Sequence, residues 1–227
     1  MIGGPVARAG SLVVVEGIEG SGKSTLVANL AERLTAYGCD VVTLRDPGGT
    51  ALGDEIRALL LTSTHTPAPA TEALLFMASR AELVTQHVAP ALADGRIVLL
   101  DRFLLSTLAY QVAGRGLNEY AVLAANTLAL GRVTTAVTFV LDLPFEEGMR
   151  RATRRGALDR IEREGEAFHR RVAAQFTAAL EPSWQNIHPE CGQVVRLDGM
   201  ATPEELVEEA WQILSVYEVI PYRPVAP

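Results

Sequence analysis

The sequence contains few cysteines and no long apolar run. Cys39 and Cys191 are the only cysteines among the 227 residues, too few and too far apart for a disulfide framework or a zinc site. No apolar run approaches the roughly 20 residues that a membrane span needs, and residues 1–10 lack the basic and apolar regions of a secretory signal. These absences favour a cytoplasmic protein with reduced thiols and no membrane partner.

Basic residues are also few, and almost all are of one kind. The net charge of −7 and the pI near 5.2 argue against a nucleic-acid partner. Lys23 is the only lysine, and the other nineteen basic residues are arginines. A lysine ends in a compact ammonium on a flexible stem, whereas an arginine ends in a planar fork. A general bias toward arginine would also explain this count, but position 23 lies in a motif that uses an ammonium.

Apolar residues make up 48% of the chain, and their spacing alternates between strand and helix periods. Short apolar runs predict buried strands at 12–15, 40–44, 97–100, 136–141 and 194–197. Helical spacing predicts helices at 24–37, 52–61, 72–92, 104–113, 118–130, 145–153, 167–180 and 203–216. We therefore expect one α/β domain over residues 11–216, with a five-stranded parallel sheet and helices on both faces. Residues 1–10 and 217–227 are expected to be a flexible N-terminal tail and a proline-rich C-terminal tail.

A glycine-rich loop joins the first predicted strand to the first helix. Its sequence, Gly17-x-x-x-x-Gly22-Lys23-Ser24, is the phosphate-loop pattern in the expected strand–loop–helix context, which disfavours a chance turn. Glycines let successive backbone N–H groups point at phosphate oxygens, and the helix N-terminus adds positive charge. Lys23 adds a mobile positive charge. The predicted ATP-binding residues are Gly17, Ile18, Glu19, Gly20, Ser21, Gly22, Lys23, Ser24 and Thr25.

An acid and an arginine, Asp101 and Arg102, follow the third predicted strand. Because the carboxyl ends of parallel strands meet at one rim of the sheet, we expect Asp101 to lie near Ser24. A carboxylate and a hydroxyl together suit Mg²⁺, and the Arg102 guanidinium can fork onto a phosphate. The alternative is an ordinary strand-end acid beside a surface arginine.

Two predicted helices carry side chains suited to a nucleotide base. Phe76 and Arg80 are four residues apart and share a helix face, so they offer a ring for stacking and a donor for a carbonyl. Ser106 and Tyr110 share a face of the next helix, with Gln111 one position off. A glutamine offers both a donor and an acceptor to a pyrimidine edge. Taken alone, each group is as well explained by core packing or a solvated surface.

Residues 150–163 contain six arginines in an acidic protein. Such a run is commonly a solvated face. However, phosphoryl transfer needs positive charge on the transferring group, and the phosphate loop has no arginine between Gly17 and Lys23. We therefore predict a mobile lid over about residues 150–164. Arg155 is the first candidate for a transition-state arginine, with Arg151 and Arg160 as alternatives.

Together these segments resemble the thymidylate kinase family, from about residue 11 to residue 216. The resemblance is carried by residues 17–24, 45–50, 75–80, 101–103, 106, 109–111, 114–117 and 159–162. It implies the P-loop nucleoside monophosphate kinase fold, and phosphoryl transfer from Mg·ATP to dTMP to give dTDP and ADP. It also implies a homodimer. The arginine-free phosphate loop and arginine-rich lid resemble the bacterial type of the family.

The resemblance further implies roles for single residues. Phe76 would stack on thymine, Tyr110 would lie beside the sugar and disfavour a 2′-hydroxyl, and Glu19 would meet the 3′-hydroxyl. Arg102 would act in catalysis beside Lys23 as well as on the acceptor phosphate. The implied dTMP site comprises Glu19, Arg45, Phe76, Arg80, Arg102, Ser106, Tyr110 and Gln111, and the implied metal ligands are Ser24 and Asp101.

Two positions depart from the family pattern. Asp46 replaces the usual glutamate of the second loop and is one methylene shorter, and Phe103 stands where tyrosine or histidine is common. Three other functions remain open: another small P-loop kinase, a regulatory NTPase without an acceptor, and a remnant that only binds nucleotide. The regulatory NTPase would leave the acceptor-side arginines unexplained, and the remnant would leave the intact Lys23, Ser24 and Asp101 unexplained.

Overall fold

Five parallel strands form the centre of the molecule. The computed structural model describes residues 10–156 and 158–220. The strands are β1 (Ser11–Glu16), β2 (Val41–Arg45), β3 (Ile97–Asp101), β4 (Val137–Asp142) and β5 (Gln193–Asp198), in the order β2-β3-β1-β4-β5. Every neighbouring pair is parallel. The predicted five-stranded parallel sheet is therefore confirmed.

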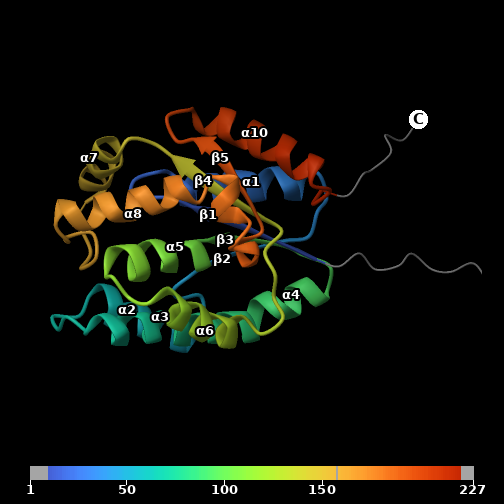
Figure 1. Ribbon diagram of the computed structural model, residues 1–227. Coiled ribbons are helices and arrows are strands. Elements are labelled where there is room, and N and C mark those ends of the chain that lie inside the picture. Colours follow the sequence, from blue (N-terminus) through green and yellow to red (C-terminus); the bar gives the residue numbers. More distant parts are fainter. Residues whose placement is uncertain (1–9, 157, 221–227) are drawn as a thin grey trace, which may run out of the picture.

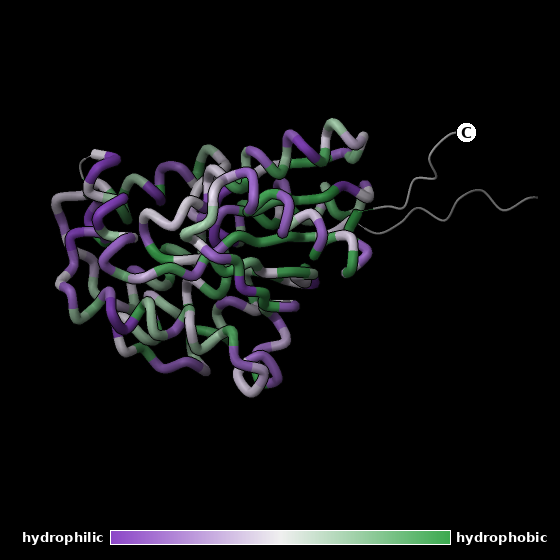
Figure 2. The backbone as a smooth tube through the Cα atoms, turned by 90° about the horizontal axis from the view of Figure 1, so that it is seen from above, coloured by the Kyte–Doolittle hydropathy of each residue, from purple (hydrophilic) through white to green (hydrophobic). Residues whose placement is uncertain are grey.

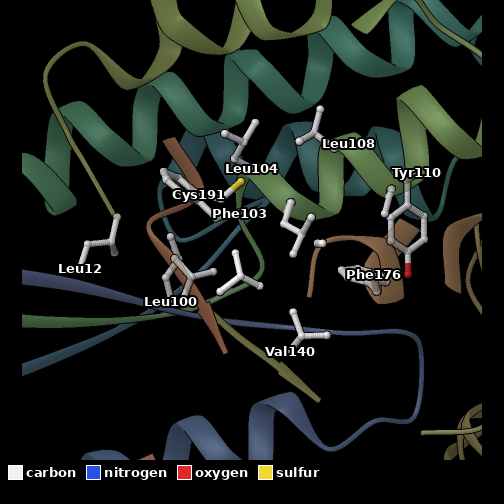
Figure 3. Close-up of a cluster of buried hydrophobic side chains, with 14 of the residues drawn as sticks. Leu12, Leu100, Phe103, Leu104, Leu108, Tyr110, Val140, Phe176 and Cys191 are labelled. Atoms are coloured by element: carbon white, nitrogen blue, oxygen red, sulfur yellow. The ribbon is translucent and has the colours of Figure 1, made fainter. Parts of the chain in front are cut away.

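The central strand β1 supplies both halves of the core. Its side chains alternate between the two faces of the sheet. Leu12 and Val14 belong to the cluster shown in Figure 3, whereas Val13 and Val15 belong to the cluster on the other face. Because both faces are covered, the strand reads as a continuous apolar run rather than an alternating one.

Helices cover each face of the sheet, as expected (Figure 1). The helices α1 (Lys23–Ala36) and α10 (Pro203–Val216) pack on one face. The other face carries α3 (Pro69–Leu83), α4 (Ala89–Ala93), α5 (Leu104–Thr107) and α8 (Glu166–Ala178). The remaining helices are α2 (Ala51–Leu61), α6 (Glu119–Leu130), α7 (Phe145–Arg155) and the short α9 (Pro182–Gln185). Apolar segments run through the interior in Figure 2, and polar segments lie at the outer turns.

The predicted helix over 72–92 differs from the structure at its start and in its middle. It begins at Pro69 rather than at residue 72, because proline fits the first turn of a helix. A π-helical stretch, Val84–Val88, then separates α3 from α4. Pro90 has no N–H and its ring crowds the carbonyl four residues earlier, and the wider π turn lies at this point.

The predicted helix over 104–113 is also divided. An α-helical turn, α5, is followed by the π helix Leu108–Gly114. A π helix bonds residue i to residue i+5, so positions four and five apart come close to one face. Ser106, Tyr110 and Gln111 therefore all line the same cavity, although the α-helical expectation placed Gln111 off the shared face.

Residues just before the first strand and just after the last helix also pack against the domain. Val219 and Ile220 are buried in the cluster beneath α1 and α10, and the N–H of Gly10 donates to the carbonyl of Leu92. Of the predicted tails at 1–10 and 217–227, residues 1–9 and 221–227 lie outside the described residues. Among the residues that are described, no helix is both long enough and apolar enough to cross a membrane.

Candidate active site

A cavity of about 500 Å³ opens at the carboxyl ends of the strands. Parallel α/β sheets bind ligands at this rim because each strand there leads into a loop. The predicted site residues that line it are Glu19, Gly20, Gly22, Lys23, Ser24, Thr25, Arg45, Phe76, Arg80, Asp101, Arg102, Ser106, Tyr110, Gln111, Arg151 and Arg155. Gly17, Ile18, Ser21 and Arg160 are not among the lining residues.

The phosphate loop wraps around the single lysine. The Lys23 ammonium donates to the carbonyl oxygens of Gly17 (3.1 Å) and Ile18 (2.7 Å) and to Ser21 Oγ (3.2 Å). Burial and the nearby Arg102 guanidinium lower the pKa of Lys23 to about 8. Gly17 and Ser21 thus contact Lys23 from within the loop and do not line the cavity.

Gly20 shows why the loop requires glycine. Its φ is +70°, in the left-handed region, and a Cβ there would lie 2.1 Å from the carbonyl oxygen of Gly148 on α7. Any larger residue would push the loop away from that helix.

Ser24 and Asp101 meet across the cavity floor, as predicted. The Ser24 hydroxyl donates to Asp101 Oδ2, which joins the first turn of α1 to the end of β3. The two side chains place a hydroxyl and a carboxylate oxygen together beside the phosphate loop. Such a donor set fits a hard divalent cation.

The loop acid Glu19 lies between positive and hydrogen-bonding groups. Tyr110 OH donates to Glu19 Oε1, and Arg102 Nη2 lies 3.4 Å from the same oxygen. Burial alone would raise the pKa of Glu19, but the charges of Arg102 and Lys23, together with hydrogen bonds that include the one from Tyr110, outweigh burial and lower it. Glu19 is therefore an ionised acceptor in the wall of the cavity.

Arg80 donates to three oxygen acceptors, which lie in the loop after β2, in the turn after β3 and on α6. Its Nε donates to Asp46 Oδ2 (2.6 Å), its Nη1 to Asn126 Oδ1 (2.6 Å) and its Nη2 to the carbonyl oxygen of Phe103 (3.0 Å). The side chain is only 2% exposed. A guanidinium carries five N–H groups, so these contacts orient Arg80 and still leave Nη2 a hydrogen for a ligand.

The three lid arginines occupy different environments. Arg155 has a 63% exposed side chain that pairs with Glu162. Arg151 pairs with Glu147 at 2.6 Å and donates to the carbonyl oxygen of Gly199 at 2.9 Å. Arg160 is buried, and its contacts are with α2 and α3 rather than with the cavity.

Comparison with known proteins identifies relatives over most of the chain. The sequence profile described as "Thymidylate kinase" matches residues 15–191. A thymidylate kinase of Chlorobaculum parvum is 41% identical over 217 residues, covering 92% of this chain and 97% of the relative. One from Alcanivorax borkumensis is 46% identical over 178 residues, covering 77% and 86%. The crystal structure of a thymidylate kinase from Ehrlichia chaffeensis matches with a TM-score of 0.71 at 28% identity, covering 92% of this chain and 100% of that one.

The chain belongs to the thymidylate kinase family. The two residues that depart from the family pattern, Asp46 and Phe103, both contact Arg80. Asp46, although shorter than glutamate, reaches Arg80 at 2.6 Å. The Phe103 ring lies 4.9 Å from the Arg80 guanidinium and makes a cation–π contact instead of a hydrogen bond.

Sequence reasoning missed several residues of this family member's site. Arg57 lines the cavity and donates to the carbonyl oxygen of Pro47 at 2.8 Å. Glu16 and Glu72 are fully buried acids that hold the cavity wall. A signal for Glu72 was present, because residues 72, 76 and 80 follow one another at four-residue spacing on a single helix face.

The perturbed lysine predicts a pH dependence of nucleotide binding. In the free protein Lys23 loses its proton near pH 8, whereas bound phosphates favour the ammonium and raise that pKa. Binding is therefore strongest below pH 8 and weakens above it, by at most about tenfold per pH unit. Calorimetry with Mg·ATP at pH 7 and pH 9 measures this. Lys23→Met has no charge to lose and should bind Mg·ATP weakly at both pH values. If its affinity fell between pH 7 and pH 9 as much as that of the wild type, the pH dependence would not come from Lys23.

Proposed function

We propose that this cavity binds ATP over the phosphate loop and dTMP over the Phe76 side, so that the chain transfers the γ-phosphoryl group of ATP to dTMP, giving dTDP and ADP. Family membership supports this activity. The observation that carries it is the joining of two half-sites in one cavity, a phosphate loop and an aromatic, arginine and glutamine surface. A regulatory NTPase would need only the first half.

On the donor side, we propose that the loop N–H groups and Lys23 bind the phosphates and stabilise the charge that develops on them. Thymidylate kinases are ATP-using enzymes that generally need a divalent metal. The hydroxyl of Ser24 and the carboxylate of Asp101, which already contact each other, would hold Mg²⁺. When bound, such an ion would neutralise charge on the phosphates of ATP.

On the acceptor side, Phe76 provides the stacking surface, and the Arg80 Nη2 hydrogen left unused by Phe103 donates to a base carbonyl. Glu19 and Tyr110 lie together and would border the sugar, with Glu19 accepting from the 3′-hydroxyl. The acceptor phosphate would be bound by Arg45 and Arg102, with the Ser106 hydroxyl accepting from Arg102 in the same wall, and Arg57 adds a third guanidinium nearby.

The proposed function is tested by ranking nucleoside monophosphates as phosphate acceptors. We expect kcat/KM to fall from dTMP to dUMP, because one methyl in an apolar pocket is worth about 1–3 kcal/mol. dCMP and AMP should lie far lower, because buried polar groups would be left unpaired. UMP should lie below dUMP because of Tyr110. A coupled assay of ADP release at fixed Mg·ATP gives these values. AMP or dCMP matching dTMP would point to another small kinase, and ATP turnover without any monophosphate would point to a regulatory NTPase.

We propose Arg155 as the transition-state arginine of the lid. It is exposed and lines the cavity, whereas Arg160 is buried. Arg155→Ala should lower kcat by on the order of 10³-fold. Arg160→Ala should instead destabilise the fold by about 3–5 kcal/mol, because it strips a partner from a buried carboxylate. Steady-state kinetics and urea unfolding separate the two effects. Arg154→Ala is the control, because Arg154 is exposed on α7 and does not line the cavity. If Arg155→Ala lowered kcat by less than about tenfold, Arg155 would not be the transition-state arginine.

We propose a homodimer through the face formed by α2, α3 and α6, which lie side by side in Figure 1. Leu74, Tyr120 and Leu128 on this face are 62%, 85% and 87% exposed, an apolar surface typical of an interface. Light scattering should report a dimer for the wild type and a monomer for Leu128→Asp. Ile187→Asp, 68% exposed elsewhere, should remain dimeric. A monomeric wild type would refute the proposal.

The cytoplasmic location stays a prediction that cell fractionation can test.

A further inference from the structure

The cavity residue Gln111 is held from behind by a buried acid. Its Nε2 donates to Glu72 Oε1 at 3.1 Å, and both side chains are only 1% exposed. Gln111 lies on the π helix after α5 and Glu72 on α3. The contact therefore joins the two elements that we assign to base recognition.

Glu72 is held as a carboxylate by three partners. Arg115 donates to it twice, through Nε to Oε1 and through Nη2 to Oε2, each at 3.0 Å. Arg160 Nη2 donates to Oε2 at 2.6 Å. Burial would raise the pKa of Glu72, but the hydrogen bonds from Arg115, Arg160 and Gln111 outweigh burial and lower it. Two guanidinium groups thus keep the buried acid ionised.

An ionised carboxylate decides which end of the neighbouring amide faces it. A carboxylate only accepts hydrogen bonds, and only the NH₂ end of a glutamine amide donates them. Gln111 must therefore turn Nε2 toward Glu72, and Oε1 is the amide atom left to meet a ligand in the cavity. The reverse orientation would set two acceptors against each other and leave the NH₂ group without Glu72.

We propose that Glu72 is a specificity-determining positioning residue, which fixes Gln111 as an acceptor and so selects a base with an N–H at ring position 3. This proposal rests on the proposed function. Thymine and uracil carry that N–H, whereas cytosine has a bare acceptor nitrogen there. Arg80, a donor, reads the adjacent carbonyl. The pair Arg80 and Gln111 then presents one donor and one acceptor, and the acceptor role depends on Glu72.

The same carboxylate connects base recognition to the lid. Arg160 also donates through Nε to the carbonyl oxygen of Leu60 at 2.7 Å, and its backbone N–H donates to the carbonyl oxygen of Leu61 at 3.1 Å. Residue 160 is thereby pinned between α2 and Glu72. Glu72 Oε1 thus contacts the amide of Gln111, which we assign to base recognition. Glu72 Oε2 contacts Arg160, which anchors the proposed lid.

Glu72→Gln tests the orientation while keeping the size of the side chain. An amide at position 72 can donate as well as accept, so Gln111 becomes able to turn its NH₂ group toward the cavity. We expect the ratio of kcat/KM for dTMP over dCMP to fall about tenfold, with part of the change from a gain on dCMP, and the KM for ATP to stay within about twofold. In a Gln111→Ala background the same substitution should leave the ratio unchanged, because no amide remains to be oriented.

Glu164→Gln is the matched control. It removes the carboxylate that pairs with Arg115 Nη1 at 2.7 Å and leaves the Gln111 contact intact, so the ratio should not change. An unchanged ratio in folded Glu72→Gln, or an equal fall in both backgrounds, would overturn the proposal. A wild type that does not prefer dTMP would instead overturn the proposed function. If Glu72→Gln does not fold, a crystal structure of the wild type with dTMP decides. We expect Gln111 within hydrogen-bond distance of both Glu72 and base position 3, and separation of Gln111 from Glu72 would refute the role.

Discussion

The carboxylate of Glu16 connects the two halves of the active site. It ends the central strand immediately before the phosphate loop and accepts from the backbone N–H groups of Phe103 (2.8 Å) and Ser106 (3.0 Å), and from the Ser106 hydroxyl. Buried N–H groups at the start of a helix must find an acceptor. For α5, which follows β3, Glu16 supplies that acceptor from the end of β1. The turn after β3 is thereby fixed relative to the phosphate loop.

Much of the acceptor site depends on that turn. Arg102 adopts a left-handed φ of +69°, a conformation that costs energy for a residue with a side chain and persists only where the surroundings hold it. The carbonyl of Phe103 in the same turn accepts from Arg80. The hydroxyl of Ser106 accepts from Arg102 at 3.0 Å. Through these contacts, Glu16 helps to place Arg80 and Arg102, which we propose to bind the base and the phosphate of the acceptor.

Paired charges are the second constraint on this cavity. Arg80 pairs with Asp46, Arg102 with Glu19, and Arg155 with Glu162. The Arg80 guanidinium is buried, and without a partner it would carry a large desolvation cost. The acids hold the arginines in place before any ligand arrives, which reduces the reorganisation that binding and phosphoryl transfer require. The acidic net charge of the chain is consistent with this use of carboxylates.

Local sequence determined the phosphate loop, the order of strands and helices, and the meeting of Ser24 with Asp101. Each follows from a short pattern, or from the rule that parallel strands end at one rim. Only the tertiary structure decided that Asp46 and Asn126 hold Arg80, that Glu72 holds Gln111, and that Arg160 is an anchor while Arg155 faces the cavity. These partners lie 34 to 88 residues apart in the chain. Their pairing depends on helix packing and on the π turns, which no local spacing encodes.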